Sequence, residues 1–97
     1  MMRYQVYADL SRRLTEEERS AVFEALEINV PDSGCVGPQN REEDEVYFSV
    51  EAPSDDKASA LAAHYMNIVI SHAGLDVQYM LALQTIDGGF RAWTPET

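Results

Sequence analysis

The sequence predicts a single α+β domain, in which four antiparallel strands form one sheet and two helices cover one of its faces. The prediction rests on segments in which apolar residues alternate, on two segments with helical spacing and caps, and on the order of these segments. A chain of 97 residues is long enough for one domain with one modest core.

The first two elements are a strand over residues 3–10 and a helix that follows Thr15. Thr15 and Glu18 have the spacing of a capping box, with Thr15 as the N-cap and Glu18 three residues later. Pro31 marks the end of this helix. Alternation along the strand is typical of a sheet with one buried face. The residues expected to face the core are Tyr4, Val6, Ala8 and Leu10 in the strand and Val22, Phe23 and Leu26 in the helix.

The middle of the chain predicts an edge strand, a polar loop and a central strand. Residues 34–37 fit a short edge strand, and residues 38–44 fit a polar loop that closes a hairpin. Residues 45–52 are the clearest strand of the chain. In it, Val46, Phe48 and Val50 alternate with Tyr47, Ser49 and Glu51.

A second helix, a last strand and a tail complete the chain. Ser54 is the expected N-cap of the helix, and Gly74 stands where a left-handed C-cap residue is expected. Residues 77–86 alternate again as a strand, whereas residues 87–97 are expected to form a flexible C-terminal tail. The domain is therefore expected to span residues 1–86.

The order strand, helix, strand, strand, helix, strand is that of the ferredoxin-like βαββαβ fold. Its four-stranded antiparallel sheet carries both helices on one face and leaves the other face open. The expected core consists of Val6, Leu10, Phe23, Leu26, Phe48, Val50, Leu61, Tyr65, Val69, Leu81 and Leu83.

Composition and charge exclude several classes of protein. Lys and Arg number 7 against 17 Asp and Glu, which gives a formal net charge of −10. Direct binding to nucleic acid needs clusters of Lys and Arg, so this balance argues against it. The sequence also shows no apolar run long enough for a membrane span and no secretory signal. We therefore expect a cytoplasmic protein without nucleic-acid or membrane contact.

The sequence offers no motif for catalysis, for a cofactor or for a metal ion. Phosphate loops, dinucleotide fingerprints, zinc spacings and the nucleophile elbow are all absent from it. His64 and His72 lie about 12 Å apart along the second helix, too far to bind one metal ion. Cys35, the single cysteine, is expected to be a buried or half-buried structural thiol. We expect a protein that is not an enzyme and holds no cofactor.

The face of the sheet without helices is the first candidate interaction site. Alternation places Tyr7 and Tyr47 on this face, and the expected strand order brings Met80 and Ala82 beside them. An apolar group within a polar rim is typical of a contact surface, and a homodimer is its simplest use. An ordinary solvated face with a few large side chains fits the same pattern. The expected rim residues are Gln5, Ser49, Gln78 and Gln84.

A run of four acids, Glu42, Glu43, Asp44 and Glu45, is the second candidate site. Such a run fits a solvated surface that keeps a protein soluble. It also fits an electronegative surface that binds a basic protein by imitating the phosphates of nucleic acid.

Several segments of the chain resemble a known group of proteins. They are Tyr4-Gln5-Val6-Tyr7, Leu14-Thr15-Glu16-Glu17, Phe23-Glu24-Ala25-Leu26-Glu27 and Phe48-Ser49-Val50-Glu51-Ala52, followed by an alanine-rich second helix. Together they resemble small, uncharacterised ferredoxin-like proteins of actinobacteria and of their phages and mobile elements. The resemblance covers about residues 2–86. It implies this fold and a cytoplasmic setting, and it carries over no activity and no functional residue.

These observations favour a non-enzymatic interaction module that self-associates through the open sheet face. The first alternative is an acidic inhibitor that binds a nucleic-acid-binding protein, in a conflict between phage and host. The second alternative is a small-ligand-binding domain whose site lies in the cleft of a dimer.

Overall fold

The computed structural model describes residues 2–85 and 90–93, and its first six elements follow the order that the sequence predicts. The elements are β1 (Met2–Leu10), α1 (Glu16–Asn29), β2 (Gly34–Pro38), β3 (Asp44–Ala52), α2 (Asp55–Ala73), β4 (Tyr79–Gln84) and β5 (Phe90–Trp93).

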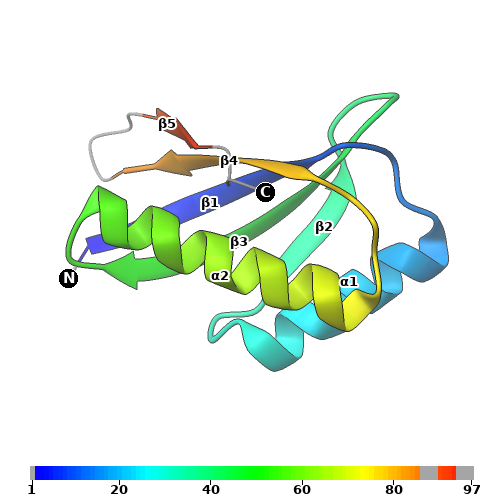
Figure 1. Cartoon of the computed structure of the whole chain (residues 1–97), viewed down its shortest axis with the longest axis horizontal. Coiled ribbons are helices and arrows are strands. Elements are labelled where there is room, and N and C mark those ends of the chain that lie inside the picture. Colours follow the sequence, from blue (N-terminus) through cyan, green and yellow to red (C-terminus); the bar gives the residue numbers. More distant parts are fainter. Residues whose placement is uncertain (1, 86–89, 94–97) are drawn as a thin grey trace.

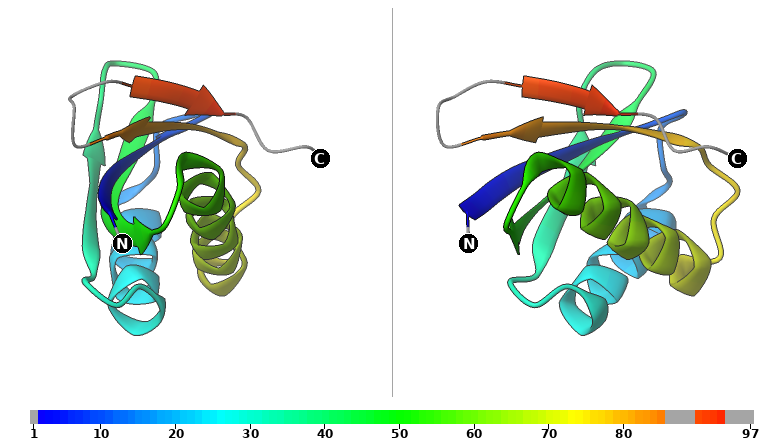
Figure 2. Two further views of the ribbon diagram at one scale, coloured as in Figure 1. Left: turned by 90° about the vertical axis from the view of Figure 1, so that its left-hand side faces the viewer. Right: turned by 60° about the vertical axis from the view of Figure 1, so that its left-hand side comes forward.

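All the strands belong to one antiparallel sheet with the order β2-β3-β1-β4-β5. Both helices lie on the same side of this sheet (Figure 1). The sheet is strongly twisted, so that β2 and β4 run in clearly different directions (Figure 2). The predicted ferredoxin-like fold is confirmed, because β1 to β4 and both helices take the expected places.

A fifth strand extends the sheet beyond the four that the sequence predicts. β5 pairs with β4, so the tail predicted for residues 87–97 is corrected at residues 90–93. Residues 86–89 and 94–97 lie outside the described residues. A strand of four residues is too short to show an alternating pattern. The sequence Asp87-Gly88-Gly89, which separates the two paired strands, belongs to a type that favours hairpins.

Both helices begin and end where their caps predict. The Glu18 N–H donates to Thr15 Oγ1 at 3.1 Å and the Thr15 N–H donates to Glu18 Oε1 at 2.9 Å, which confirms the capping box. The Lys57 N–H donates to Ser54 Oγ at 3.3 Å. Gly74 ends α2 with a φ of 68°, a left-handed conformation that glycine adopts without steric cost. Local sequence therefore determines the length of both helices.

β2 is the predicted edge strand and continues one residue further than expected, to Pro38. β2 lies so close to β3 that a Cβ atom at Gly34 would collide with the main-chain carbonyl oxygen of Tyr47. Glycine is therefore required where this edge strand begins.

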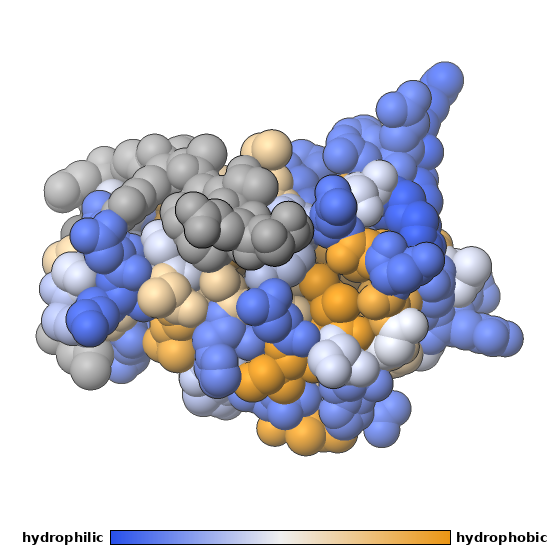
Figure 3. All heavy atoms as spheres, viewed as in Figure 1, coloured by the Kyte–Doolittle hydropathy of each residue, from blue (hydrophilic) through white to orange (hydrophobic). Residues whose placement is uncertain are grey.

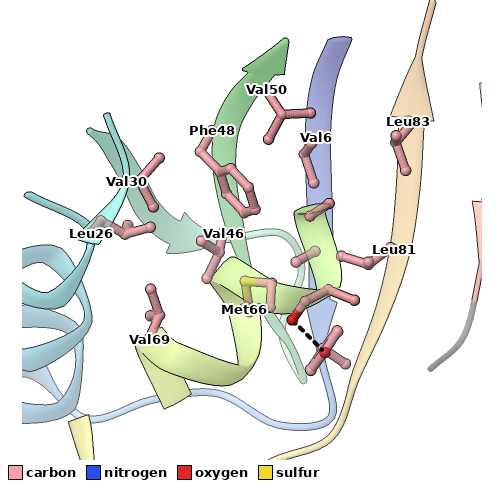
Figure 4. Packing of buried hydrophobic residues seen from close by; sticks show 14 of the residues in the cluster. Val6, Leu26, Val30, Val46, Phe48, Val50, Met66, Val69, Leu81 and Leu83 are labelled. Atoms are coloured by element: carbon pink, nitrogen blue, oxygen red, sulfur yellow. Dashed lines mark hydrogen bonds between the residues drawn. The ribbon is translucent and has the colours of Figure 1, made fainter. Parts of the chain in front are cut away.

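Apolar side chains from the sheet and both helices meet in one core (Figure 4). The alternation predicted for β1 is confirmed, since its four inward residues are at most 1% exposed. Two residues of the predicted core, Leu61 and Tyr65, are only partly buried at its margin. The predicted core residues that are buried are Val6, Leu10, Leu26, Phe48, Val50, Val69, Leu81 and Leu83.

Phe23 is the residue that the sequence places wrongly in the core. Its exposed fraction is 44%, whereas Val22, Ala25 and Leu26 on the same helix are buried. The buried residues Val22, Ala25 and Leu26 are centred on the direction of Val22, and a single step along a helix turns by about 100°. Phe23 is therefore turned away from the buried stripe and lies at the surface beside Val36 of β2.

The side of the molecule that carries the helices has a mixed surface. Apolar side chains form separate patches there, with hydrophilic side chains between them (Figure 3). Within the described residues, no helix is long and apolar enough to span a membrane.

The difference between Leu26 and Phe23 can be measured. Leu26→Ala should lower the free energy of unfolding by about 3 kcal/mol, because it leaves a cavity in a fully buried site. Phe23→Ala should lower it by less than about 1 kcal/mol, because that ring is already half in water. Urea unfolding followed by circular dichroism measures both values, and equal losses would place Phe23 in the core after all.

Candidate functional site

The open face of the sheet brings the four predicted apolar residues onto one surface. Tyr7 of β1 lies opposite Tyr47 of β3 on one side and opposite Ala82 of β4 on the other. The two tyrosine rings meet edge to face, with centroids 5.6 Å apart and planes at 86°, an arrangement that aromatic pairs favour. Met80 lies two residues from Ala82 on β4 and is 52% exposed. We call Tyr7, Tyr47, Met80 and Ala82 the apolar group.

Polar side chains beside the apolar group are hydrogen-bonded to each other across the strands. The Tyr7 hydroxyl donates to Gln84 Oε1 at 3.2 Å. Gln5 Nε2 donates to the Phe48 carbonyl oxygen at 3.2 Å, and Ser49 Oγ donates to Gln5 Oε1 at 3.3 Å. Because these polar groups are already bonded within the sheet, covering them with another surface costs little.

Two carboxyl groups meet on the same face, next to the apolar group. Asp9 of β1 lies opposite Glu45 of β3, and their side chains share a hydrogen bond. Glu45 is only 8% exposed, and Asp9 Oδ1 is buried without a hydrogen-bond partner. In residues 2–85, no salt bridge joins either carboxyl group to a cation. We call Asp9 and Glu45 the acid pair; sequence reasoning missed it, because their pairing depends on the register of β1 against β3.

The surroundings of Glu45 change its affinity for a proton. Burial of Glu45, its hydrogen bond with Asp9 and the negative charge of Asp9 raise its pKa to about 7, although a hydrogen bond from Tyr47 opposes this change. In turn, the hydrogen bond to Glu45, together with burial, raises the pKa of Tyr47 to about 12. The acid pair therefore binds a proton near neutral pH, while Tyr47 stays protonated and acts as a donor.

Asp44, the residue before Glu45, points to the opposite side of β3 and has cationic partners. Its buried carboxylate accepts hydrogen bonds from Arg19 Nε at 2.7 Å, from Arg19 Nη2 at 2.9 Å and from the Leu14 N–H at 3.2 Å. Arg13 Nε lies 2.8 Å from it. Burial acts to raise the pKa of Asp44, but the hydrogen bonds from Arg19 and Leu14 and the charges of Arg19 and Arg13 outweigh it and lower the pKa.

Only two of the four acids predicted as an acidic surface reach that surface. Glu42 is exposed and Glu43 is half-buried in the loop between β2 and β3. Asp44 and Glu45 are buried, with exposed fractions of 0% and 8%. The reason is that β3 begins at Asp44, so the alternation of the strand sends Asp44 to the core side, whereas Glu45 is covered on the open face beside Asp9 and Tyr47.

A cavity of about 270 Å³ lies at the end of the open face. Asp9, Ser11, Glu43 and Met80 are among the residues that line it. Its volume is at the lower limit of pockets that hold small organic ligands, which is about 300 Å³. The cavity adjoins both the apolar group, through Met80, and the acid pair, through Asp9.

The sequence also singled out Cys35, His64 and His72, and all three are exposed. Cys35 is exposed opposite Tyr47, so the expectation of a buried or half-buried thiol is wrong. The reason is that β2 is an edge strand and Cys35 lies on its open-face side. His64 and His72 are exposed on α2. In the part of the chain that the structure describes, no three His, Cys, Asp or Glu side chains are placed to hold a metal ion.

Comparisons with protein-family models, with curated proteins and with solved structures found no match for this chain. Its function must therefore be inferred from the geometry of the open face.

The buried ion pairs of Asp44 lead to a first prediction for this region. Asp44→Asn removes the charge that Arg13 and Arg19 bind, so the free energy of unfolding at neutral pH should fall by about 3 kcal/mol. Asp32→Asn is the control, because Asp32 pairs with Arg3 at 3.1 Å where both side chains are more than half exposed. That change should cost less than about 1 kcal/mol. Urea unfolding compares the two variants, and similar losses would contradict the role given to Asp44.

The neighbouring change, Glu45→Gln, should act in the opposite direction. The pKa of Glu45 is raised from 4.5 to about 7 on folding, so the wild-type protein loses stability as the pH rises from about 4.5 to about 7. Gln keeps the shape of the side chain and the hydrogen bonds with Asp9 and Tyr47, but it does not ionise. The variant should match the wild type near pH ~4 and exceed its free energy of unfolding by about 3 kcal/mol near pH ~8. Urea unfolding at a series of pH values measures this difference, which must grow with pH for the assignment to hold.

Proposed function

We propose that this protein is a non-enzymatic interaction module that self-associates as a symmetric homodimer through the open face of its sheet. The observation that carries the proposal is the apolar group. Met80 is more than half exposed beside the edge-to-face pair of Tyr7 and Tyr47, and both helices lie on the other side of the sheet. Exposed apolar residues surrounded by polar ones are typical of contact surfaces.

The hydrogen bonding around the apolar group favours a second copy of the chain as the partner. Gln5, Ser49 and Gln84 are bonded within the sheet, so they present few free groups for recognition by a partner of different chemistry. Contact with another such face leaves these bonds intact and buries apolar surface on both sides. A surface of this kind is complementary to itself, as a twofold axis requires.

The size of the open face determines how much of it a dimer must cover. With strands about 4.8 Å apart and about 3.4 Å per residue, the five strands form a plane of roughly 500 Å². Stable interfaces bury about 800 Å² per partner, measured over the uneven surface of the side chains. A dimer of this kind therefore has to use most of the face rather than one corner of it.

An acidic inhibitor of a basic protein is the alternative, and it is supported by the net charge of −10. The acidic surface available to such an inhibitor is smaller than the sequence suggested, because Asp44 and Glu45 are buried.

A ligand-binding site in a dimer cleft is the third possibility. The cavity beside Met80 is the place in the structure where such a site could lie.

Replacing Met80 tests the proposed dimer. The wild-type mass in light scattering after size exclusion should be twice the 10.9 kDa of one chain. Met80→Arg places a charge within the apolar part of the contact and should weaken the dimer at least about tenfold.

Ile28→Arg is the matched control, because Ile28 is 61% exposed on α1 and lies away from the open face. It should leave the dimer intact, and circular dichroism should show that both variants are folded. A wild-type protein that stays monomeric up to millimolar concentration would contradict the proposal.

A further inference from the structure

We propose that proton uptake by the acid pair controls self-association of the open face, so that the dimer forms at mildly acidic pH and weakens as the pH rises. This inference rests on the proposed dimer and adds its regulation.

The position of the acid pair places it inside the proposed contact. Asp9 lies opposite Met80 and two residues from Tyr7 along β1. Glu45 lies two residues from Tyr47 along β3 and accepts a hydrogen bond from it. A second copy seated on Tyr7, Tyr47 and Met80 therefore covers the acid pair as well.

Among the described residues, no positively charged side chain lies opposite the acid pair on β2 or β4 or lines the cavity beside it. From β2, Gly37 lies opposite Glu45 and carries no side chain, and the next open-face residue along that strand is the thiol of Cys35. From β4, Met80 lies opposite Asp9. From the loop between β2 and β3, Glu43 lines the same cavity as Asp9 and adds a further carboxyl group.

The cation nearest to the acid pair on the open face of β1 to β4 is distant from it. Arg3 is six residues from Asp9 along β1, a separation of about 20 Å. It also lies opposite Glu51 and forms a salt bridge with Asp32 at 3.1 Å. The charged residues at the open-face positions of these strands are Arg3, Asp9, Glu45 and Glu51, so acids outnumber the single cation.

Dimer formation therefore favours the protonated acid pair. Covering an ionised pair removes the remaining water from its charges, and no salt bridge within residues 2–85 supplies a cation in exchange. The protonated pair carries one charge less, and its proton is shared in the hydrogen bond between Asp9 and Glu45. Since the pKa of Glu45 is about 7 in a single copy, further burial in a dimer raises it and couples association to proton uptake near and above neutral pH.

The test is the dissociation constant of the dimer as a function of pH. Sedimentation equilibrium of the full chain at constant ionic strength, from about pH 5.5 to about pH 8.5, measures it. The constant should be steady below pH ~6 and rise above pH ~7, by up to about tenfold per pH unit for each proton taken up.

Two variants of the acid pair locate the responsible proton. Glu45→Gln cannot ionise and should keep a tight dimer throughout, with a dissociation constant that no longer depends on pH. Asp9→Asn removes the negative charge opposite Glu45, so the dimer should begin to weaken at a lower pH than in the wild type. The second variant also serves if the first does not fold.

Matched controls separate the acid pair from other charges. Glu51→Gln removes one negative charge from the same strand and the same face, at its other end, and should keep the pH dependence. Histidine is the other side chain that commonly changes charge near neutral pH. His64 and His72 are exposed on α2, in the helix layer, so replacing both by Gln should also keep it.

The outcomes distinguish the two proposals. A dimer whose dissociation constant falls on acidification, with that dependence lost in Glu45→Gln, supports both. A dimer that is insensitive to pH, or a Glu45→Gln variant with the wild-type pH profile, keeps the dimer and overturns the control by protons. The absence of a dimer at every pH overturns both.

Discussion

The ion pairs around the buried carboxylate of Asp44 are the constraint on which the arrangement of the sheet depends. They join the first residue of β3 to Arg13 in the segment before α1 and to Arg19 of α1, and the Leu14 N–H adds a hydrogen bond to the same carboxylate. The main chain adds a hydrogen bond from the Asp44 N–H to the Arg12 carbonyl oxygen at 3.3 Å. A charge buried this deeply is tolerated only with such partners, so β3 cannot slide along β1 without breaking them.

The same constraint produces the acid pair on the opposite face. Because side chains alternate along a strand, directing Asp44 towards Arg19 directs Glu45 to the open face, where the register places it opposite Asp9. Asp44 and Glu45 therefore lie in opposite electrostatic surroundings. Two arginines hold the pKa of Asp44 low, whereas burial and a second carboxyl group hold the pKa of Glu45 high. Ionisation of Glu45 costs stability, and ionisation of Asp44 provides it.

Much of the fold could be predicted from the sequence because its signals are local. Alternation identified the strands, and Thr15, Ser54 and Gly74 marked the helix ends within a few residues of the groups that they bind. The open-face grouping of Tyr7 with Tyr47 also followed from alternation and strand order. Asp44 and Glu45 could not be placed, since burial of a carboxylate depends on partners that the fold brings from other strands and helices. The fifth strand was missed because four residues carry too little pattern.

The two parts of the open face have different physical roles in the proposed dimer. Burial of Tyr7, Tyr47 and Met80 stabilises the contact through apolar area, a contribution that does not depend on pH. Asp9 and Glu45 oppose the contact when ionised, and the net charge of −10 on each chain adds long-range repulsion. Salt screens this repulsion between exposed charges but acts much less on a buried pair. The dependence on the protonation of Glu45 should therefore persist at physiological ionic strength, where the general repulsion between the two chains is already weak.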